Sequence, residues 1–82
     1  MPKETARRIL AHIERQGITA TLAPNRRGVS FQADQPTIKR IFPEAQQIAA
    51  KRGHFCKHTK NESTGEHSIS VLTRKALEKH KR

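Results

Sequence analysis

The sequence predicts a small α+β domain in which two β-hairpins form a four-stranded antiparallel sheet with helices packed on one face. Three observations support this fold class. Apolar residues recur at helical spacing in some segments, alternate with polar residues in others, and Gly and Pro mostly fall between these segments. A chain of 82 residues has room for one hydrophobic core, so we expect a single domain over residues 1–82. The expected order of elements is α-β-β-α-β-β-α.

The first helix is expected over residues 4–16, because Ala6, Ile9 and Ile13 fall on one face. Glu4 and Arg8 are spaced as an i, i+4 ion pair, and Gly17 stands where a left-handed residue commonly ends a helix. Alternation predicts a β-hairpin over residues 18–23 and 29–33, joined by the turn sequence 24–28.

The second half of the chain repeats this arrangement. Asp34 or Thr37 is expected to cap a second helix, which Pro43 should interrupt to give a short first turn, a kink and a regular helix over residues 43–52. Gly53 then precedes a second hairpin over residues 54–59 and 66–72. Thr73 is expected to cap a last basic helix over residues 74–80, with a frayed end at 79–82.

The expected core is small, so we predict marginal stability that an anion or self-association, for example as a homodimer, would increase. It comprises Ile9, Leu10, Ile13, Ile18, Leu22, Val29, Phe31, Ile38, Ile41, Phe42, Ile48, Phe55, Ile69, Val71, Leu72 and Leu77.

The charge of the chain points to a class of partner. Seventeen Lys and Arg oppose seven Asp and Glu, for a net charge of +10. Each third of the sequence is basic, so we expect a basic surface spread widely over the fold. Nucleic acid is the usual partner of such a surface, and a membrane is not expected because no apolar run is long enough to span one.

Several groups of polar residues are candidate nucleic-acid contacts. Arg8 and Arg15 lie on the first helix opposite its apolar face, with His12 beside them, and a second group is expected on the outer face of the second helix. Adjacent arginines at a hairpin tip suit a phosphate backbone or a narrow minor groove. The full set of predicted contacts is Arg8, Arg15, Arg26, Arg27, Arg40, Gln47, Lys51, Lys57 and Lys60.

The aromatic content bears on the form of nucleic acid. The chain has three Phe and no Trp or Tyr, whereas single-strand recognition uses aromatic side chains on which bases stack. Phe31 and Phe42 follow the apolar pattern, which leaves Phe55 as the one candidate for stacking. The composition therefore favours duplex DNA or structured RNA.

One strand carries residues that are able to bind metal or act in catalysis. His54, Cys56 and His58 alternate along it, with His67 on the partner strand, so zinc binding is geometrically conceivable. The usual paired ligand spacings are absent, and the preferred interpretation is a strand with polar side chains outward and Cys56 packed as a small apolar group. As a ribonuclease, the chain would use His54 or His58 as base and Lys57 or Arg52 at the phosphate.

Two short resemblances accompany these residues. Gly53 and His54 at the start of a strand, with the basic hairpin that follows, are similar over residues 53–58 to toxin ribonucleases of the HicA kind, with Phe55 where that family has a second histidine. Arg8 and His12 have the Arg-x-x-x-His form that names a family of single-strand nucleic-acid domains, and the segment 24–27 before a strand is similar to that family too. This second resemblance covers about twenty residues.

The sequence therefore predicts a non-enzymatic, cytoplasmic nucleic-acid-binding protein without metal or cofactor, acting as a small regulatory or accessory factor. Two alternatives stay open. One is an adaptor or inhibitor, for example phage-encoded, that docks on an acidic protein surface by electrostatic steering. The other is the small ribonuclease.

Overall fold

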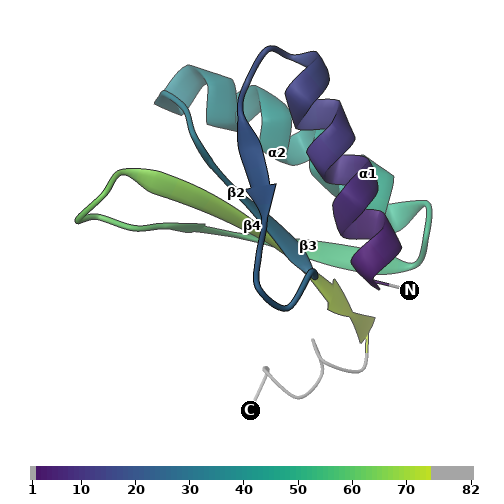
Figure 1. Cartoon of the computed structure of the whole chain (residues 1–82). Helices are drawn as coiled ribbons and strands as arrows, with labels where there is room; N and C mark the ends of the chain where they lie inside the picture. Colours follow the sequence, from purple (N-terminus) through teal and green to yellow (C-terminus); the bar gives the residue numbers. More distant parts are fainter. Residues whose placement is uncertain (1, 75–82) are drawn as a thin grey trace.

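The described part of the chain folds as two helices over a four-stranded sheet, which confirms the α+β prediction (Figure 1). The computed structural model describes residues 2–74. In chain order the elements are α1 (Pro2–Arg15), β1 (Ala20–Leu22), β2 (Gly28–Gln32), α2 (Gln35–Ala50), β3 (His54–Lys60) and β4 (Glu66–Thr73). Apart from Arg74, the helix predicted over 74–80 and the frayed end at 79–82 lie outside the described residues.

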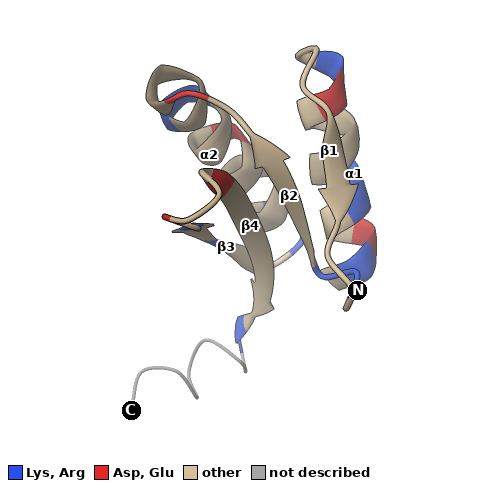
Figure 2. Ribbon diagram, turned by 60° about the vertical axis from the view of Figure 1, so that its left-hand side comes forward, with Lys and Arg blue, Asp and Glu red and all other residues tan. Residues whose placement is uncertain are grey.

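The two hairpins join through their second strands. The strand order is β1-β2-β4-β3 and every neighbouring pair is antiparallel. Val29 of β2 is opposite Ile69 of β4, and Ile69 is opposite His58 of β3. The two central strands are therefore β2 and β4, and β1 and β3 form the edges. Both helices lie over the same face of this sheet, α1 above β1, β2 and β4 and α2 above β3 (Figures 1 and 2).

The core lies between the helices and the covered face of the sheet. Ile9, Ile13, Ile41, Ile69 and Val29 are almost completely buried there. The other fully buried apolar residues are Ala6, Phe31, Ile38, Ala45, Ala49, Cys56 and Val71, and the partly buried ones around them are Leu10, Ile18, Ala20, Leu22, Ala33, Phe42 and Ile48.

The core prediction is wrong at two positions. Phe55 and Leu72 are opposite each other on β3 and β4, on the face that no described helix covers, and Phe55 is 37% exposed. The sequence spacing does not reveal which face of β3 is buried, because Cys56 and not Phe55 points toward α2. Leu77 lies outside the described residues. Two polar residues, Thr5 and His67, are buried instead.

Helix α2 is longer than predicted. Asp34 caps it by accepting a 3.0 Å hydrogen bond from the Thr37 N–H. Hydrogen bonding to the Thr37 side chain, and then to the Thr37 N–H, lowers the pKa of the Asp34 carboxyl. The predicted break at Pro43 is wrong, since the helix continues from Gln35 to Ala50 with Pro43 inside it. Burial of Ile38 and Ile41 before the proline and of Ala45 and Ala49 after it stabilises one continuous helix against the cost of the lost hydrogen bond.

The ends of both helices follow the sequence prediction. Gly17 and Gly53 adopt left-handed conformations with φ of 82° and 74°. Each glycine lies between a helix and the first strand of a hairpin and turns the chain back along the sheet. The chain therefore consists of two successive units, each a helix followed by a hairpin.

Candidate nucleic-acid interface

Five parts of the chain meet at one end of the molecule: the start of α1, the β1–β2 turn, the end of α2, the start of β3 and the end of β4. The Thr5 hydroxyl hydrogen-bonds His54 Nδ1 at 2.8 Å, which joins α1 to β3. The Arg27 carbonyl accepts the Val71 N–H at 2.7 Å, which joins the turn to β4. Arg52, just after α2, contacts the carboxylate of Glu4 at 3.0 Å.

This end, here called the cationic end, gathers most of the positive charge of the described residues. It holds eight Lys and Arg and a single acid, Glu4; the cations are Lys3, Arg7, Arg8, Arg26, Arg27, Lys51, Arg52 and Arg74. Figure 2 shows this polarity, with basic segments around the N-terminus, the β1–β2 turn and the end of β4, and mixed charges at the opposite end.

The rest of the described chain is electrically balanced. It holds five cations, Arg15, Lys39, Arg40, Lys57 and Lys60, and five acids, Glu14, Asp34, Glu44, Glu62 and Glu66. The excess charge of residues 2–74 therefore lies at one end, and the predicted wide distribution over the surface is wrong for this part of the chain. The sequence does not reveal this polarity, because the four segments that supply these cations are far apart along the chain.

The β1–β2 turn presents Arg26 and Arg27 to solvent. Asn25 organises the turn, because its side-chain oxygen accepts the Arg27 N–H at 2.9 Å. Arg26 has a φ of 60°, a left-handed conformation that is uncommon outside Gly and Asn. Hydrogen bonds from the Ala23 N–H to the Gly28 carbonyl and from the Arg26 N–H to the Ala23 carbonyl close the turn. Two guanidinium groups are thus held on an ordered tip.

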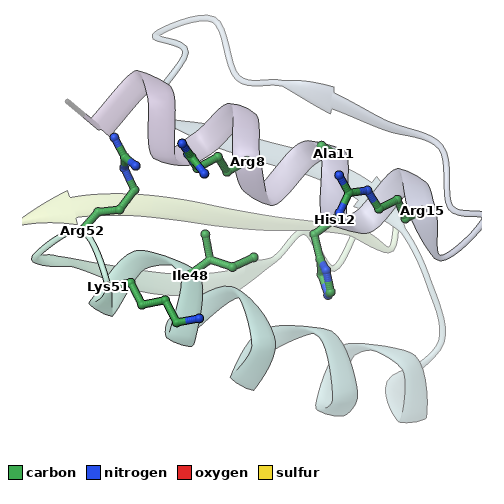
Figure 3. Close-up of a pocket in the computed structure, with 7 residues that line it drawn as sticks. All are labelled: Arg8, Ala11, His12, Arg15, Ile48, Lys51 and Arg52. Atoms are coloured by element: carbon green, nitrogen blue, oxygen red, sulfur yellow. The ribbon is translucent and has the colours of Figure 1, made fainter.

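A groove of about 450 Å³ runs between the two helices, with Arg8, Ala11, His12 and Arg15 on the α1 side (Figure 3). The other side is formed by Ile48, Lys51 and Arg52 from the end of α2. Ala11 and Ile48 supply apolar surface between the charged groups. This interhelical groove opens into the cationic end through Arg8, Lys51 and Arg52, so the two features form one basic surface.

Two carboxylates from neighbouring positions partly neutralise the groove. Glu44 Oε1 lies 3.1 Å from His12 Nε2, a contact that links the two helices. Glu4 lies 3.0 Å from Arg52 and 3.7 Å from Arg8. Neither Arg15 nor Lys51 pairs with an acid among residues 2–74, which leaves both free to meet an anion.

The structure brings together some of the predicted contacts and separates others. Arg8, Arg15 and Lys51 line the interhelical groove, and Arg26 and Arg27 lie at the cationic end. Arg40 and Gln47 are exposed on α2 but do not line the groove. Lys57 is on the open face of the sheet, and Lys60 is at the far end of β3.

Arg52 lines the groove but is absent from the predicted nucleic-acid contacts, although the ribonuclease alternative places it at the phosphate. Helical spacing offers a signal, since position 52 follows Ile48 by four residues and extends the same side of α2. Its Nε atom is buried and has no hydrogen-bond partner in the described structure. Arg52 therefore has an unused donor beside the groove.

The histidines and cysteine of β3 take part in separate contacts within the fold. The Cys56 thiol is buried against the Ala45 carbonyl at 3.6 Å, and burial raises its pKa to about 11. His54 hydrogen-bonds Thr5, and His58 Nε2 lies 2.9 Å from Nδ1 of the buried His67. The two histidines point toward the helices and not outward as predicted. Cys56 is packed as a small apolar group, as predicted. Within residues 2–74 no three His, Cys, Asp or Glu side chains are grouped to hold a metal ion.

The same geometry bears on the ribonuclease hypothesis. Burial, followed by nearby positive charge including that of Arg52, lowers the pKa of His54, and burial with the neighbouring His67 lowers that of His58. Lys57 faces the opposite side of β3 from both histidines, because alternate residues of a strand point to opposite faces. Of the two proposed phosphate-binding partners, only Arg52 lies near either histidine, beside His54.

Neither of the helices in the described part of the chain combines the length and apolar character needed to cross a bilayer. Comparisons with protein-family models, with curated proteins and with solved structures give no significant match to this chain.

Proposed function

We propose that this protein binds nucleic acid without catalysing a reaction, and that its cationic end and interhelical groove contact the phosphates of duplex DNA or structured RNA. The observation that supports this function most directly is the polarity of charge: eight cations and one acid at one end of a fold that is otherwise balanced. A surface of this kind attracts a polyphosphate from one side and orients the protein on it.

The shape of the basic surface suits a duplex. Arg26 and Arg27 project from a turn, where they are able to straddle a phosphate backbone, and Arg8, Arg15 and Lys51 line a separate groove between the helices. The exposed aromatic ring of the described residues, Phe55, lies on the open face of the sheet, whereas this groove lies on the helical side. The proposed role is that of a small cytoplasmic accessory or regulatory factor.

The proposal is tested by measuring binding to duplex DNA, duplex RNA and single strands by fluorescence anisotropy over a range of salt concentrations. Neutralisation of about five phosphates gives a log–log salt slope of about −4 to −5. The double variant Arg26→Ala/Arg27→Ala should weaken binding roughly tenfold or more and make the slope shallower by about two. Its control is Lys39→Ala/Arg40→Ala, which removes two cations from the balanced part of the molecule.

Equal losses in the two double variants would show that net charge, and not the cationic end, governs binding. A slope near zero for the unmodified protein would contradict the proposed function itself. An acidic protein partner suits the same polarity, and it predicts a complex that survives nuclease treatment and is insensitive to Arg26→Ala/Arg27→Ala.

A further inference from the structure

Glu4 occupies a special position in the basic surface. It is the only acid at the cationic end within residues 2–74, and its carboxylate reaches cations from two different parts of the chain. Glu4 Oε2 lies 3.0 Å from Nη2 of Arg52, and Glu4 Oε1 lies 3.7 Å from Nη2 of Arg8. The sequence predicts the i, i+4 contact with Arg8, but the shorter contact is with Arg52, 48 residues further along the chain.

The chemistry of this contact matches that of a bound phosphate. One anionic group places a separate oxygen toward each of two guanidinium groups, which is how arginines commonly hold phosphates. Arg52 also keeps a buried Nε–H without an acceptor. A carboxylate has two oxygens, and both already face a guanidinium. A backbone phosphodiester also offers two charged oxygens, and a terminal phosphate offers a third.

Glu4 is free to leave this position. Its side chain is 55% exposed and lies in the first turn of α1, where solvent is available to it, while Arg52 is held more firmly with 28% exposure. Exposed ion pairs of this type contribute little binding free energy, so an incoming phosphate meets only modest competition.

We propose that Arg8 and Arg52 form a phosphate subsite, and that Glu4 takes the place of the phosphate when no nucleic acid is bound. This inference rests on the proposed function and adds a residue that limits affinity. Binding requires Glu4 to move out of the subsite, and its negative charge opposes the phosphate on approach. Removing the carboxylate therefore strengthens binding.

The test compares three variants with the unmodified protein in the same anisotropy assay. Glu4→Gln is expected to bind duplex up to about fivefold more tightly, which is the upper limit for one exposed ion pair that no longer competes. Glu14→Gln, at the opposite end of the same helix, makes an identical change in net charge and should alter affinity by less than about twofold. Glu4→Asp keeps the charge but shortens the side chain by one methylene, so binding should tighten by an intermediate factor.

The source of the phosphate is resolved by using duplexes with and without 5′-terminal phosphates. An equal gain with both assigns the subsite to the backbone, and a gain only with the phosphorylated duplex assigns it to a chain end. Adding Arg52→Gln to the Glu4→Gln variant should abolish the gain.

The outcome separates this inference from the proposed function. If the unmodified protein binds with the expected salt slope but Glu4→Gln and Glu14→Gln have equal affinities, Glu4 does not occupy a phosphate site. If no variant binds DNA or RNA in dilute buffer, the proposed function itself is wrong. Thermal unfolding of each variant checks that the exposed substitutions leave the fold intact.

Discussion

The two faces of the sheet differ in what their side chains do. The face beneath α1 and α2 supplies Val29, Phe31, Ile69 and Val71 to the core, together with the buried His67. The open face carries a row of hydroxyls across all four strands, formed by Thr21, Ser30, Ser68 and Thr59, in which Ser30 and Ser68 are 3.2 Å apart.

The covered face of the sheet therefore serves stability, and the proposed binding surface lies elsewhere in the molecule. The open face has Lys57 and the exposed ring of Phe55, but the concentrated positive charge lies on the helices and at the strand ends. A single-strand platform would need aromatic rings and cations together on the open sheet. Under the proposed function, nucleic acid binds at the helical side and the cationic end, and the open face, which carries few charges, takes no part.

The largest expected effect is on stability, from two positions of β4. Ile69 is fully buried on the covered face, and Leu72 is half-buried on the open face. Ile69→Ala should lower the free energy of unfolding by about 2–5 kcal/mol, and Leu72→Ala by about 1 kcal/mol or less. Chemical denaturation measures both. If Ile69→Ala prevents folding, Ile69→Val should cost about 0.5–1.5 kcal/mol. Equal losses at positions 69 and 72 would mean that the open face is covered by something else.

The second prediction concerns binding on the open face. Phe55→Ala/Lys57→Ala removes the exposed ring and the lysine of that face, and should change the affinity for duplex by less than about threefold, because one peripheral cation contributes little. The measurement is the anisotropy titration used for Arg26→Ala/Arg27→Ala. The opposite result would be a large loss of single-strand affinity in Phe55→Ala/Lys57→Ala and an unchanged affinity in Arg26→Ala/Arg27→Ala. It would place the nucleic-acid site on the open face of the sheet instead of at the cationic end.

Local patterns in the sequence were sufficient to predict most of the fold. Helical spacing correctly predicted the burial of Ile9 and Ile13, and alternation correctly predicted both hairpins. Asp34 and Gly17 correctly indicated the ends of helices. Each of these signals acts over a few residues, so it is visible in one stretch of chain. The β2–β4 pairing is different, because several ways of joining two hairpins satisfy the same alternation.

The contacts that organise the candidate site depend on that pairing. Glu4 meets Arg52 only because the start of α1 lies beside the end of α2. Gln46 makes a contact within one helix–hairpin unit that does not depend on the β2–β4 pairing: its side-chain oxygen accepts the Cys56 N–H at 3.1 Å and its nitrogen donates to the Cys56 carbonyl at 3.3 Å. These two hydrogen bonds occupy the backbone groups of Cys56 at the free edge of β3, where another strand would otherwise be able to pair. Neither contact has a signal in the local sequence.

The smallest expected effect is the pH dependence of stability. It should arise from histidines on the covered face of the sheet and not from residues on the open face. On the covered face, burial and then the neighbouring His67 lower the pKa of His58, and burial lowers that of His54. A lowered pKa means that the folded protein holds these rings neutral, while the unfolded chain begins to bind protons near pH 6.5. Stability should therefore be fully present above about pH 7 and decrease as the pH falls through 6.5 toward the folded pKa values.

His58→Gln removes one of these titrating groups and also relieves His67 of a neighbour that is able to become charged. Its free energy of unfolding, measured by denaturant titration from pH 7.5 to pH 5, should fall less steeply than that of the unmodified protein. Ser68→Ala on the open face changes no titrating group, so it should shift the curve without changing its slope. A full wild-type slope in His58→Gln would assign the pH dependence to His54, whose ring lies against Thr5 at the cationic end, and would link proton uptake to the binding surface instead of to the core.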